Sequence, residues 1–390
     1  MNAWPAALAA ADQADPGRFR ACFPQLGQRI HLASCSVAAR STELDAAIAQ
    51  MLDDMTSGAA WELFEEQVAA ARQGFARLIG ARPDQVALQP SASVAAYQVA
   101  SALDWTSRPV VVTSDAEFPS VAHVWLAQRP SGAQVRFADP AGYPAAIDER
   151  TKLVSVPLTT YRDGLRLPVP DIAAAAHSHG ARVFVDAYQA VGTEPVNVDD
   201  LGCDYLVAGS MKYLLGLPGV AFLYVRSPEA DHDPRLTGWF GRVNPFAFDP
   251  RRLDFPKRAT RFETGTPAVP ACYAANAGLS LIEQLDLAAV RKQIASLTAR
   301  CAADLTALGE DMLVPPAPDA IGAHVCLRDP APAQLVSWLA GRNITVSPRG
   351  EVIRLSFHYY NNGEDVAALC EEISRYRAQL ARAIVKETSR

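Results

Sequence analysis

Short apolar runs alternate with stretches of helical periodicity between residues 85 and 225. The runs are rich in β-branched side chains and bounded by polar or glycine residues, which is typical of strands covered on both faces. They are Val86–Leu88, Val110–Thr113, Leu153–Val156, Val183–Val185 and Tyr205–Ala208. Helical stretches follow several of them, at Val94–Leu103, after Pro119 and at Pro170–Gly180. This alternation predicts an α/β fold with a doubly wound, mainly parallel sheet.

The flanking segments have other patterns. Residues 42–79 carry apolar positions at helical spacing, interrupted near Ser57, and predict two helices. Residues 229–260 are rich in Pro, Arg and aromatic side chains without periodicity, which predicts a long irregular excursion. Beyond a helical stretch at residues 269–308, strand-like runs and helices predict a smaller α+β domain. We predict an amino-terminal segment that packs with the small domain (1–25), a large domain (26–265) and a small domain (266–390).

The composition argues against several classes of protein. The 390 residues are 49% hydrophobic and carry a formal net charge of −6, so the chain has no basic excess for nucleic acid or an anionic membrane. No stretch offers the roughly 20 unbroken apolar residues of a spanning helix, and no secretory leader is evident. We therefore expect a cytoplasmic protein without nucleic-acid or membrane partners. The seven cysteines are scattered without CxxC spacing, so we expect buried thiols and no metal site.

An acid and an amine follow two of the apolar runs. Val183–Val185 ends in Asp186, and Tyr205–Ala208 leads through Ser210 to Lys212. The carboxyl ends of parallel strands are where α/β sheets bind ligands, so both side chains are expected at one pocket. A pyridoxal phosphate enzyme needs a lysine to hold the cofactor as a Schiff base and a carboxylate to keep the pyridine nitrogen protonated. From spacing alone, a structural ion pair is an equally good interpretation.

Two further segments offer cofactor contacts. A helix is predicted from Val94, and small residues with a hydroxyl at a helix amino terminus present backbone N–H groups to an anion. Ser93, with the amides of Ala92 and Val94, is therefore a candidate phosphate site, although a plain N-cap serine gives the same pattern. Phe118 follows a predicted strand, where its face is placed to stack on a planar ring, although a lone phenylalanine is more often part of a core.

Taken together, these segments resemble the class V aminotransferases, a branch of the fold-type I pyridoxal phosphate enzymes. The branch includes cysteine desulfurases, selenocysteine lyases and isopenicillin N epimerases, with kynureninases nearby. The resemblance runs over nearly the whole chain. It rests on Val185–Ala190, on Ser210–Lys212 with Pro218 and Gly219 behind it, on Arg261–Pro267, and on Ile353–Ser356 with Tyr360 and Asn361 behind it. It implies a large domain with a doubly wound sheet of the seven-stranded type and a smaller α+β carboxyl-terminal domain.

The resemblance also implies roles for single positions. Lys212 matches the Schiff-base lysine, Asp186 the carboxylate at the pyridine nitrogen, and Gln189 the residue that hydrogen-bonds the cofactor's phenolic oxygen. Arg354 matches the arginine that holds the substrate's α-carboxylate, for which a bidentate fork is suited. Thr266 matches a threonine that reaches the phosphate of the other subunit, which implies a homodimer with shared active sites. The remaining matches are Ala92 and Ser93 at the phosphate-binding turn, Ser210 at the phosphate, and Phe118 stacked over the ring.

Some positions depart from the family pattern. Met211 stands where many desulfurases have a histidine and kynureninases a tyrosine. Ser347–Glu351 contains no cysteine where desulfurases carry a persulfide-forming cysteine on a loop, and Cys326 lies in an apolar run typical of a core. These departures disfavour a persulfide-relay desulfurase. Several local segments are kynureninase-like, but Thr160 stands where relatives have an asparagine beside the substrate, which argues against strict kynureninase activity.

These matches predict a homodimeric, cytoplasmic pyridoxal phosphate enzyme that acts on an amino acid. Arg354 would anchor the carboxylate, and Lys212, once displaced by the substrate amine, would serve as general base at Cα. We expect loss of a group from Cβ, a C–S or C–C lyase reaction, with transamination a close alternative and epimerisation a third. A catalytically silent binding protein is the alternative from another class. Candidate substrate contacts, besides Arg354, are Thr160, Trp239, Arg242 and Asn244.

Overall fold

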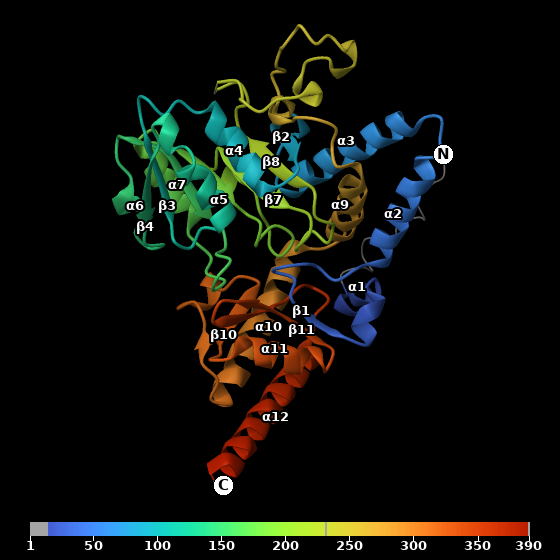
Figure 1. The fold of residues 1–390 in the computed structure, drawn as a ribbon, viewed down its shortest axis with the longest axis vertical. Coiled ribbons are helices and arrows are strands. Elements are labelled where there is room, and N and C mark those ends of the chain that lie inside the picture. Colours follow the sequence, from blue (N-terminus) through green and yellow to red (C-terminus); the bar gives the residue numbers. More distant parts are fainter. Residues whose placement is uncertain (1–14, 231, 389–390) are drawn as a thin grey trace. The chain divides into compact units, whose positions relative to one another are not determined.

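The computed structural model describes residues 15–230 and 232–388, which divide into two compact units (Figure 1). The larger unit consists of residues 43–161 and 166–283, and the smaller unit takes the described residues up to 42, residues 162–165 and those from 284 onward. This division differs from the predicted boundaries at 26 and 266. The difference arises because residues just after 26 pair with a carboxyl-terminal strand, while the helix that follows residue 268 packs on a helix of the larger unit.

A seven-stranded sheet forms the centre of the larger unit and confirms the predicted fold class. Its order is β2-β8-β7-β6-β5-β3-β4, and the strands from β7 to β4 are all parallel. β8 is antiparallel to both neighbours, so β2 runs in the same direction as β7. The strands are Val86–Gln89 (β2), Val110–Ser114 (β3), Gln134–Ala138 (β4), Thr151–Pro157 (β5), Arg182–Asp186 (β6), Tyr205–Gly209 (β7) and Ala221–Val225 (β8). The hydropathy pattern does not predict β4 because none of the residues in this edge strand is buried.

Both faces of this sheet are covered, as the continuous apolar runs predict. Successive side chains of a strand point to opposite faces, and Val183, Phe184 and Val185 on β6 are all 0% exposed. On one face, Phe184 packs against Trp125 with ring centroids 5.2 Å apart. The helices of this part of the chain are Thr42–Asp54 (α2), Ala60–Leu78 (α3), Ala92–Ala102 (α4), Pro119–Leu126 (α5), Tyr143–Ala146 (α6), Val169–Ser178 (α7), Val198–Leu201 (α8) and Val269–Ile282 (α9).

The smaller unit is built on a five-stranded sheet of order β1-β11-β12-β10-β9. Its strands are Ile30–Leu32 (β1), Met312–Leu313 (β9), His324–Arg328 (β10), Ile344–Arg349 (β11) and Val352–Ser356 (β12). Its helices are Pro16–Ala21 (α1), Leu287–Ala307 (α10), Pro332–Ala340 (α11) and Gly363–Thr388 (α12). β1 pairs with β11 in parallel, while β12 is antiparallel to β11 and to β10. These elements form the predicted α+β architecture.

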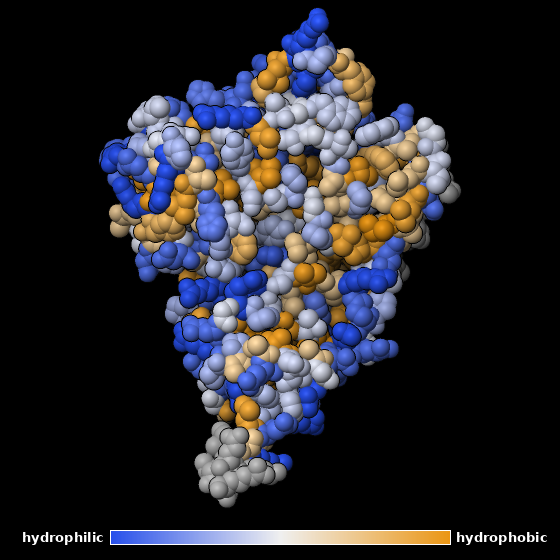
Figure 2. Space-filling model, in the orientation of Figure 1, coloured by the Kyte–Doolittle hydropathy of each residue, from blue (hydrophilic) through white to orange (hydrophobic). Residues whose placement is uncertain are grey.

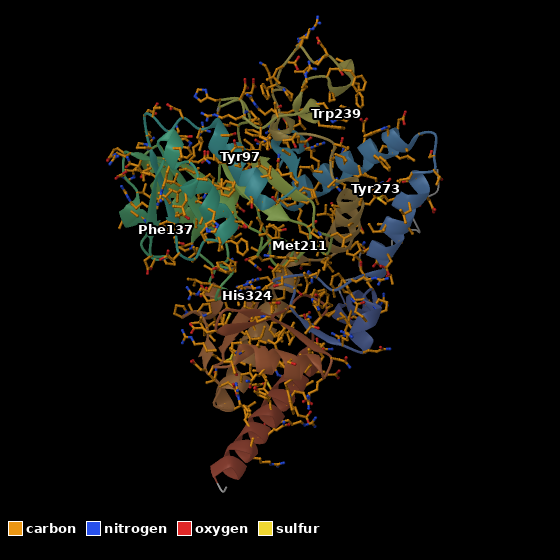
Figure 3. All side chains as sticks on the ribbon, in the orientation of Figure 1. Tyr97, Phe137, Met211, Trp239, Tyr273 and His324 are labelled. Atoms are coloured by element: carbon orange, nitrogen blue, oxygen red, sulfur yellow. The ribbon has the colours of Figure 1, made fainter. Side chains whose placement is uncertain are left out.

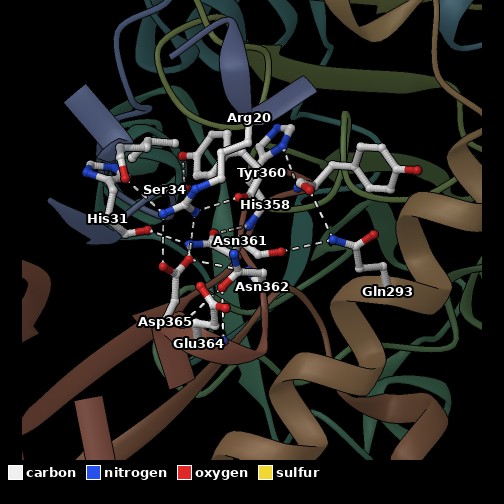
Figure 4. Close-up of polar contacts among 12 residues, drawn as sticks. Arg20, His31, Ser34, Gln293, His358, Tyr360, Asn361, Asn362, Glu364 and Asp365 are labelled. Atoms are coloured by element: carbon white, nitrogen blue, oxygen red, sulfur yellow. Dashed lines mark hydrogen bonds and ion pairs between the residues drawn. The ribbon is translucent and has the colours of Figure 1, made fainter. Parts of the chain in front are cut away.

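Arg20 connects the amino-terminal helix α1 to the carboxyl-terminal part of the smaller unit (Figure 4). Its guanidinium donates to both carboxylate oxygens of Asp365, at 2.9 and 3.1 Å, and to the Tyr360 carbonyl at 2.8 Å. Asn361 donates to the same Asp365 carboxylate at 2.8 Å. The described part of the predicted 1–25 segment therefore packs with the smaller unit, and residues 1–14 lie outside the described residues.

The excursion, defined here as residues 232–262, follows β8 without long regular elements. It contains only the short 3₁₀ turns Trp239–Gly241, Pro245–Ala247 and Ala259–Phe262, as the absence of periodicity predicts. Two of its aromatic residues, Phe246 and Phe248, are 47% and 72% exposed, whereas Phe262 is buried. Apolar side chains also gather on the surface over α2 and α3 (Figure 2), where Trp61 is 49% exposed. Among the described residues, no helix is both long and apolar enough to cross a membrane.

Candidate active site

Asp186 and Lys212 lie at the ends of adjacent parallel strands, as their sequence positions predict. Asp186 is the last residue of β6, and β6 pairs directly with β7, which ends three residues before Lys212. The Asp186 side chain is 6% exposed, and its Oδ1 accepts the backbone N–H of Tyr188 at 2.9 Å. Burial raises the pKa of Asp186, whereas the Tyr188 amide and the Lys212 charge oppose that rise. A buried carboxylate of this kind is stabilised by a cationic partner.

Aromatic rings surround the Lys212 amine. Its Nζ lies 4.5 Å from the centroid of the Tyr188 ring and 5.5 Å from that of Phe118. Burial and the neighbouring Asp186 charge raise the pKa of Tyr188 to about 12, so its hydroxyl stays protonated at neutral pH. Tyr188 was not among the predicted site residues. Its position between the expected cofactor contacts Asp186 and Gln189 was the available signal.

The loop that carries Lys212 is tightly constrained. The Leu215 N–H donates to the Lys212 carbonyl at 3.1 Å, and Leu215 adopts the left-handed φ of 60° that a non-glycine residue rarely takes. The Gly216 N–H donates to the Ser210 carbonyl at 2.8 Å, and a Cβ on Gly216 would lie only 2.9 Å from that of Ser210. The Ser210 hydroxyl donates to the Leu217 carbonyl at 2.6 Å. These contacts hold the lysine loop against the end of β7.

The predicted phosphate site lies at the amino terminus of α4, with one correction. Ser91, rather than Ser93, caps the helix, because the Ser91 Oγ accepts the Val94 N–H at 3.3 Å. Ala92 and Ser93 therefore stand in the first turn, whose amides have no intrahelical acceptor. Since β2 and β7 run in the same direction, the start of α4 and the end of β7 lie at the same edge of the sheet. This arrangement is suited to an anion at the edge that carries Ser210.

Phe118 is the N-cap residue of α5, and the residue before it is a buried acid that was not among the predicted site residues. Glu117 is 3% exposed, and its Oε1 accepts the Phe118 N–H at 2.8 Å. Its Oε2 accepts the Ser155 hydroxyl at 2.9 Å. Burial raises the pKa of Glu117 to about 8, repulsion by Asp186 adds to the rise, and the two hydrogen bonds partly offset it. The only sequence signal was a charged residue directly before a candidate stacking aromatic.

Other predicted site residues are distributed more widely. Gln189 is buried in the turn after β6, and Thr160 is buried just after β5. Thr266 is exposed on the loop between the excursion and α9. Trp239 lies on the excursion, well apart from Met211 in Figure 3. It packs with Trp61, Phe246 and Phe248 at ring-centroid distances of 6.0, 5.7 and 6.0 Å.

Arg354 belongs to the smaller unit. It lies on β12, is 1% exposed, and its Nη2 donates to the hydroxyls of Ser36 and Ser347, each at 2.7 Å. Cys326, its register partner on β10, is fully buried, as predicted, and its thiol donates to the Arg162 carbonyl at 3.0 Å. β11 and β12 are joined by a tight turn at Gly350, which agrees with the prediction that this segment leaves little room for a loop. No cluster of three metal-ligating side chains occurs in the described ranges.

The chain belongs to the class V aminotransferase family, whose model matches residues 53–369. It is 37% identical over 366 residues to the uncharacterised aminotransferase YcbU of Bacillus subtilis, a match that covers 92% of this chain and 97% of that protein. It is 30% identical to a kynureninase of Pseudomonas fluorescens, covering 69% of this chain and 68% of that enzyme. These matches confirm the resemblance found in the sequence.

Solved structures of the same fold are similar over most of their length. The cysteine desulfurase of Thermococcus onnurineus superposes with a TM-score of 0.83 at 20% identity, covering 93% of this chain and 98% of that one. The cystine C–S lyase C-DES, in complex with its product cysteine persulfide, gives a TM-score of 0.82 at 22% identity, covering 90% and 99%. At these identities the likeness concerns the fold, which is fold-type I.

The cofactor of this family is pyridoxal 5′-phosphate, and the residues at the sheet edge fit it. The fit rests on Asp186, a carboxyl only 6% exposed whose charge requires a cationic partner, which a protonated pyridine nitrogen supplies. Lys212 offers an amine at the end of the neighbouring strand, and the first turn of α4 offers amides for a phosphate. The chain therefore has the carboxylate, the amine and the backbone amides that this cofactor requires.

Proposed function

We propose that this protein is a pyridoxal phosphate enzyme that removes a group from Cβ of an α-amino acid by C–S or C–C cleavage. The observation that carries the proposal is the pairing of a buried Asp186 with Lys212 at the ends of adjacent strands. The relatives support a lyase reaction because they include a kynureninase that is 30% identical to this chain. The tight β11–β12 turn, which contains no cysteine, disfavours a persulfide relay. When bound, the cofactor supplies the electron sink that makes Cα acidic.

The chain's own residues would divide the remaining work. Lys212 would take the Cα proton once the substrate amine has displaced it, and Asp186 would keep the proton on the pyridine nitrogen. Gln189 would donate to the phenolic oxygen, while Ser93, Ala92 and Ser210 would hold the phosphate. Phe118 would contact the ring face. Arg354 would bind the substrate carboxylate, and its Nη2 is already oriented by two serine hydroxyls. Thr160 and Trp239 would contact the substrate.

A single-turnover experiment separates the possible reactions. Holoenzyme mixed with a panel of amino acids should release pyruvate or alanine together with the Cβ substituent, and the cofactor should return to its original absorbance. Accumulation of the amine form of the cofactor with a released keto acid would replace the lyase assignment with transamination. Loss of optical activity without any cleavage product would indicate epimerisation.

Transamination is a second candidate because the similarity to YcbU, described as an aminotransferase, covers nearly the whole chain.

The alternative that the chain is a catalytically silent binding protein is tested by borohydride treatment of the holoprotein. An enzyme of the proposed type should become irreversibly labelled at Lys212, and the Lys212→Ala variant should not. Absence of labelling in the unaltered protein would contradict the proposal.

We also propose a cytoplasmic homodimer in which Thr266, exposed within its own chain, contributes to the site of the partner subunit. Mixed dimers provide a test of the shared site. Lys212→Ala and Thr266→Ala homodimers should both be impaired. Hybrids prepared by joint refolding should recover activity at the one site that has both native residues. Hybrids no more active than the average of their parents would rule out the shared site.

A further inference from the structure

Glu117 differs from every other buried glutamate in the described part of the chain. Glu194 pairs with Arg166 at 2.5 Å and Glu263 pairs with Arg72 at 2.7 Å, as buried carboxylates usually do. Glu117 is equally buried, at 3% exposed, yet no Lys, Arg or His of the described residues lies within ion-pairing distance of it. Its two hydrogen-bond partners are neutral, so the burial of its charge is not compensated.

The Glu117 side chain reaches from the end of β3 toward the strand that carries Asp186. Ser155, which donates to it, lies on β5, and β5 stands between β3 and β6 in the sheet. The groups that face Glu117 come from each neighbouring element, and none is a cation. They are Asp186 from β6, the Ser155 hydroxyl from β5, the Phe118 amide at the start of α5, and the Tyr143 hydroxyl from α6, which donates to the Ser155 carbonyl at 2.9 Å.

We propose that Glu117 is a positioning residue for the cofactor. Its carboxyl group fixes Phe118 by accepting the Phe118 backbone N–H. Glu117 also retains a proton, so that Asp186 carries the single negative charge at this edge of the sheet. Two neighbouring buried carboxyl groups do not both ionise readily, so they titrate as a pair with one shared proton. Asp186 has the Lys212 charge nearby, whereas Glu117 has only neutral hydrogen-bond partners, so the proton resides on Glu117. In this protonated state the Glu117 Oε2–H donates to the Ser155 hydroxyl oxygen 2.9 Å away, while Oε1 still accepts the Phe118 N–H. A cationic pyridine nitrogen at Asp186 would favour the same distribution. The inference concerns the cofactor site and is independent of the reaction that the site performs.

Infrared spectroscopy of the apoprotein tests where the proton resides. Protein labelled with ¹³C-carboxyl glutamate should show an isotope-shifted protonated-carboxyl band at pH 7, and this band should disappear as the pH rises through about 8. Glu117→Gln should lack the band. Glu194→Gln, which removes a buried glutamate with a cation partner, should keep it. A band missing from the unaltered protein, or one that persists in Glu117→Gln, would overturn the proposal.

Cofactor titrations test the positioning role. Glu117→Gln keeps an oxygen for the Phe118 N–H and the neutral charge state, so its dissociation constant for pyridoxal phosphate at pH 7 should stay within about threefold of the original. Glu117→Ala leaves the amide without its acceptor and should weaken binding by about tenfold or more. Equal affinities for the alanine variant and the original protein, or equally weak binding by both variants, would contradict the proposal. Should Glu117→Ala fail to fold, the glutamine variant and the infrared band still decide the matter.

Discussion

The carboxyl edge of the large sheet and the excursion both present aromatic side chains, but they hold them differently. At the sheet edge, Phe118 and Tyr188 lie in the segments that follow β3 and β6 and are partly buried. Their ring centroids lie 5.5 and 4.5 Å from the Lys212 amine. On the excursion, Phe246 and Phe248 are 47% and 72% exposed on a chain without long regular elements. The sheet edge thus holds its aromatic rings beside a buried polar site, whereas these two rings of the excursion are largely open to solvent.

This comparison implies two kinds of sensitivity to mutation. Substitutions at the sheet edge should change cofactor binding and turnover, because the groups there are fixed by strand ends and buried hydrogen bonds. Substitutions on the excursion should change selectivity or assembly with small effects on the chemistry.

The largest effect is expected from Lys212→Ala. Loss of the amine removes both the covalent attachment of the cofactor and the proposed base, so turnover should fall by at least about 100-fold. Steady-state product formation measures this loss, with Trp239→Ala on the excursion as the contrasting variant. Comparable losses in the two variants would remove the functional distinction between the two regions.

Asp186→Asn should have the next largest effect. The amide occupies the same space but carries no charge to hold the proton on the pyridine nitrogen, so turnover should fall on the order of 100-fold. The matched variant is Asp254→Asn, which removes a carboxylate that pairs with Arg242 and Arg252 on the excursion. Its turnover should change less than about threefold. Turnover rates at saturating cofactor provide the comparison.

Glu117 should make the stability of the apoprotein depend on pH. The unfolded chain releases this proton near the ordinary pKa of 4.5, while the folded protein retains it to about 8. The retained proton therefore stabilises the folded protein fully below about pH 4.5, and this stabilisation is lost as the pH rises to about 8. The raised pKa of Asp186 changes the free energy of unfolding in the same direction. Glu117→Gln should therefore be more stable than the original protein above pH 8, by roughly a few kcal/mol. Urea unfolding between pH 5 and about 9 measures the difference, and an unchanged pH slope in the variant would exclude this origin.

Tyr188→Ala should weaken cofactor binding more modestly. The ring packs on Gly209, where an added Cβ would collide with it, and its face lies beside the Lys212 amine. Removing the ring should cost about 0.5–2 kcal/mol of cofactor-binding free energy, while Tyr188→Phe should bind the cofactor about as tightly as the unaltered protein. Fluorescence titration of the apoprotein separates the two variants. Equal losses would assign the effect to the hydroxyl instead of the ring.

Trp239→Ala should have the smallest effect on the folded chain. Its ring contacts are with partly exposed aromatic residues, so unfolding should become easier by no more than about 1.5 kcal/mol. The substrate preference should change while the cofactor affinity does not. Thermal unfolding and a substrate panel measure the two quantities, and unchanged preference would remove Trp239 from the candidate substrate contacts.

The sequence by itself determined the parts of this protein that depend on local pattern. Buried strands have continuous apolar runs, so β6 and β7 were recognisable, and their last polar neighbours Asp186 and Lys212 pointed to one edge of the sheet. The order of the motifs was sufficient to identify the family, which the comparisons confirmed. The sequence also predicted a short connection between β11 and β12, because too few residues separate those strands for a long loop.

The tertiary structure alone decided which polar side chains are buried and which contacts they make. Glu117 meets Ser155, 38 residues away, and lies near Asp186, so no local pattern could show that it lacks a cation. The cap of α4 is Ser91 instead of Ser93 because cap geometry depends on the turn after β2. The unit boundaries likewise depend on β1 pairing with β11, more than 300 residues along the chain. Burial and electrostatic coupling arise between distant segments, and they appear only when those segments are packed together.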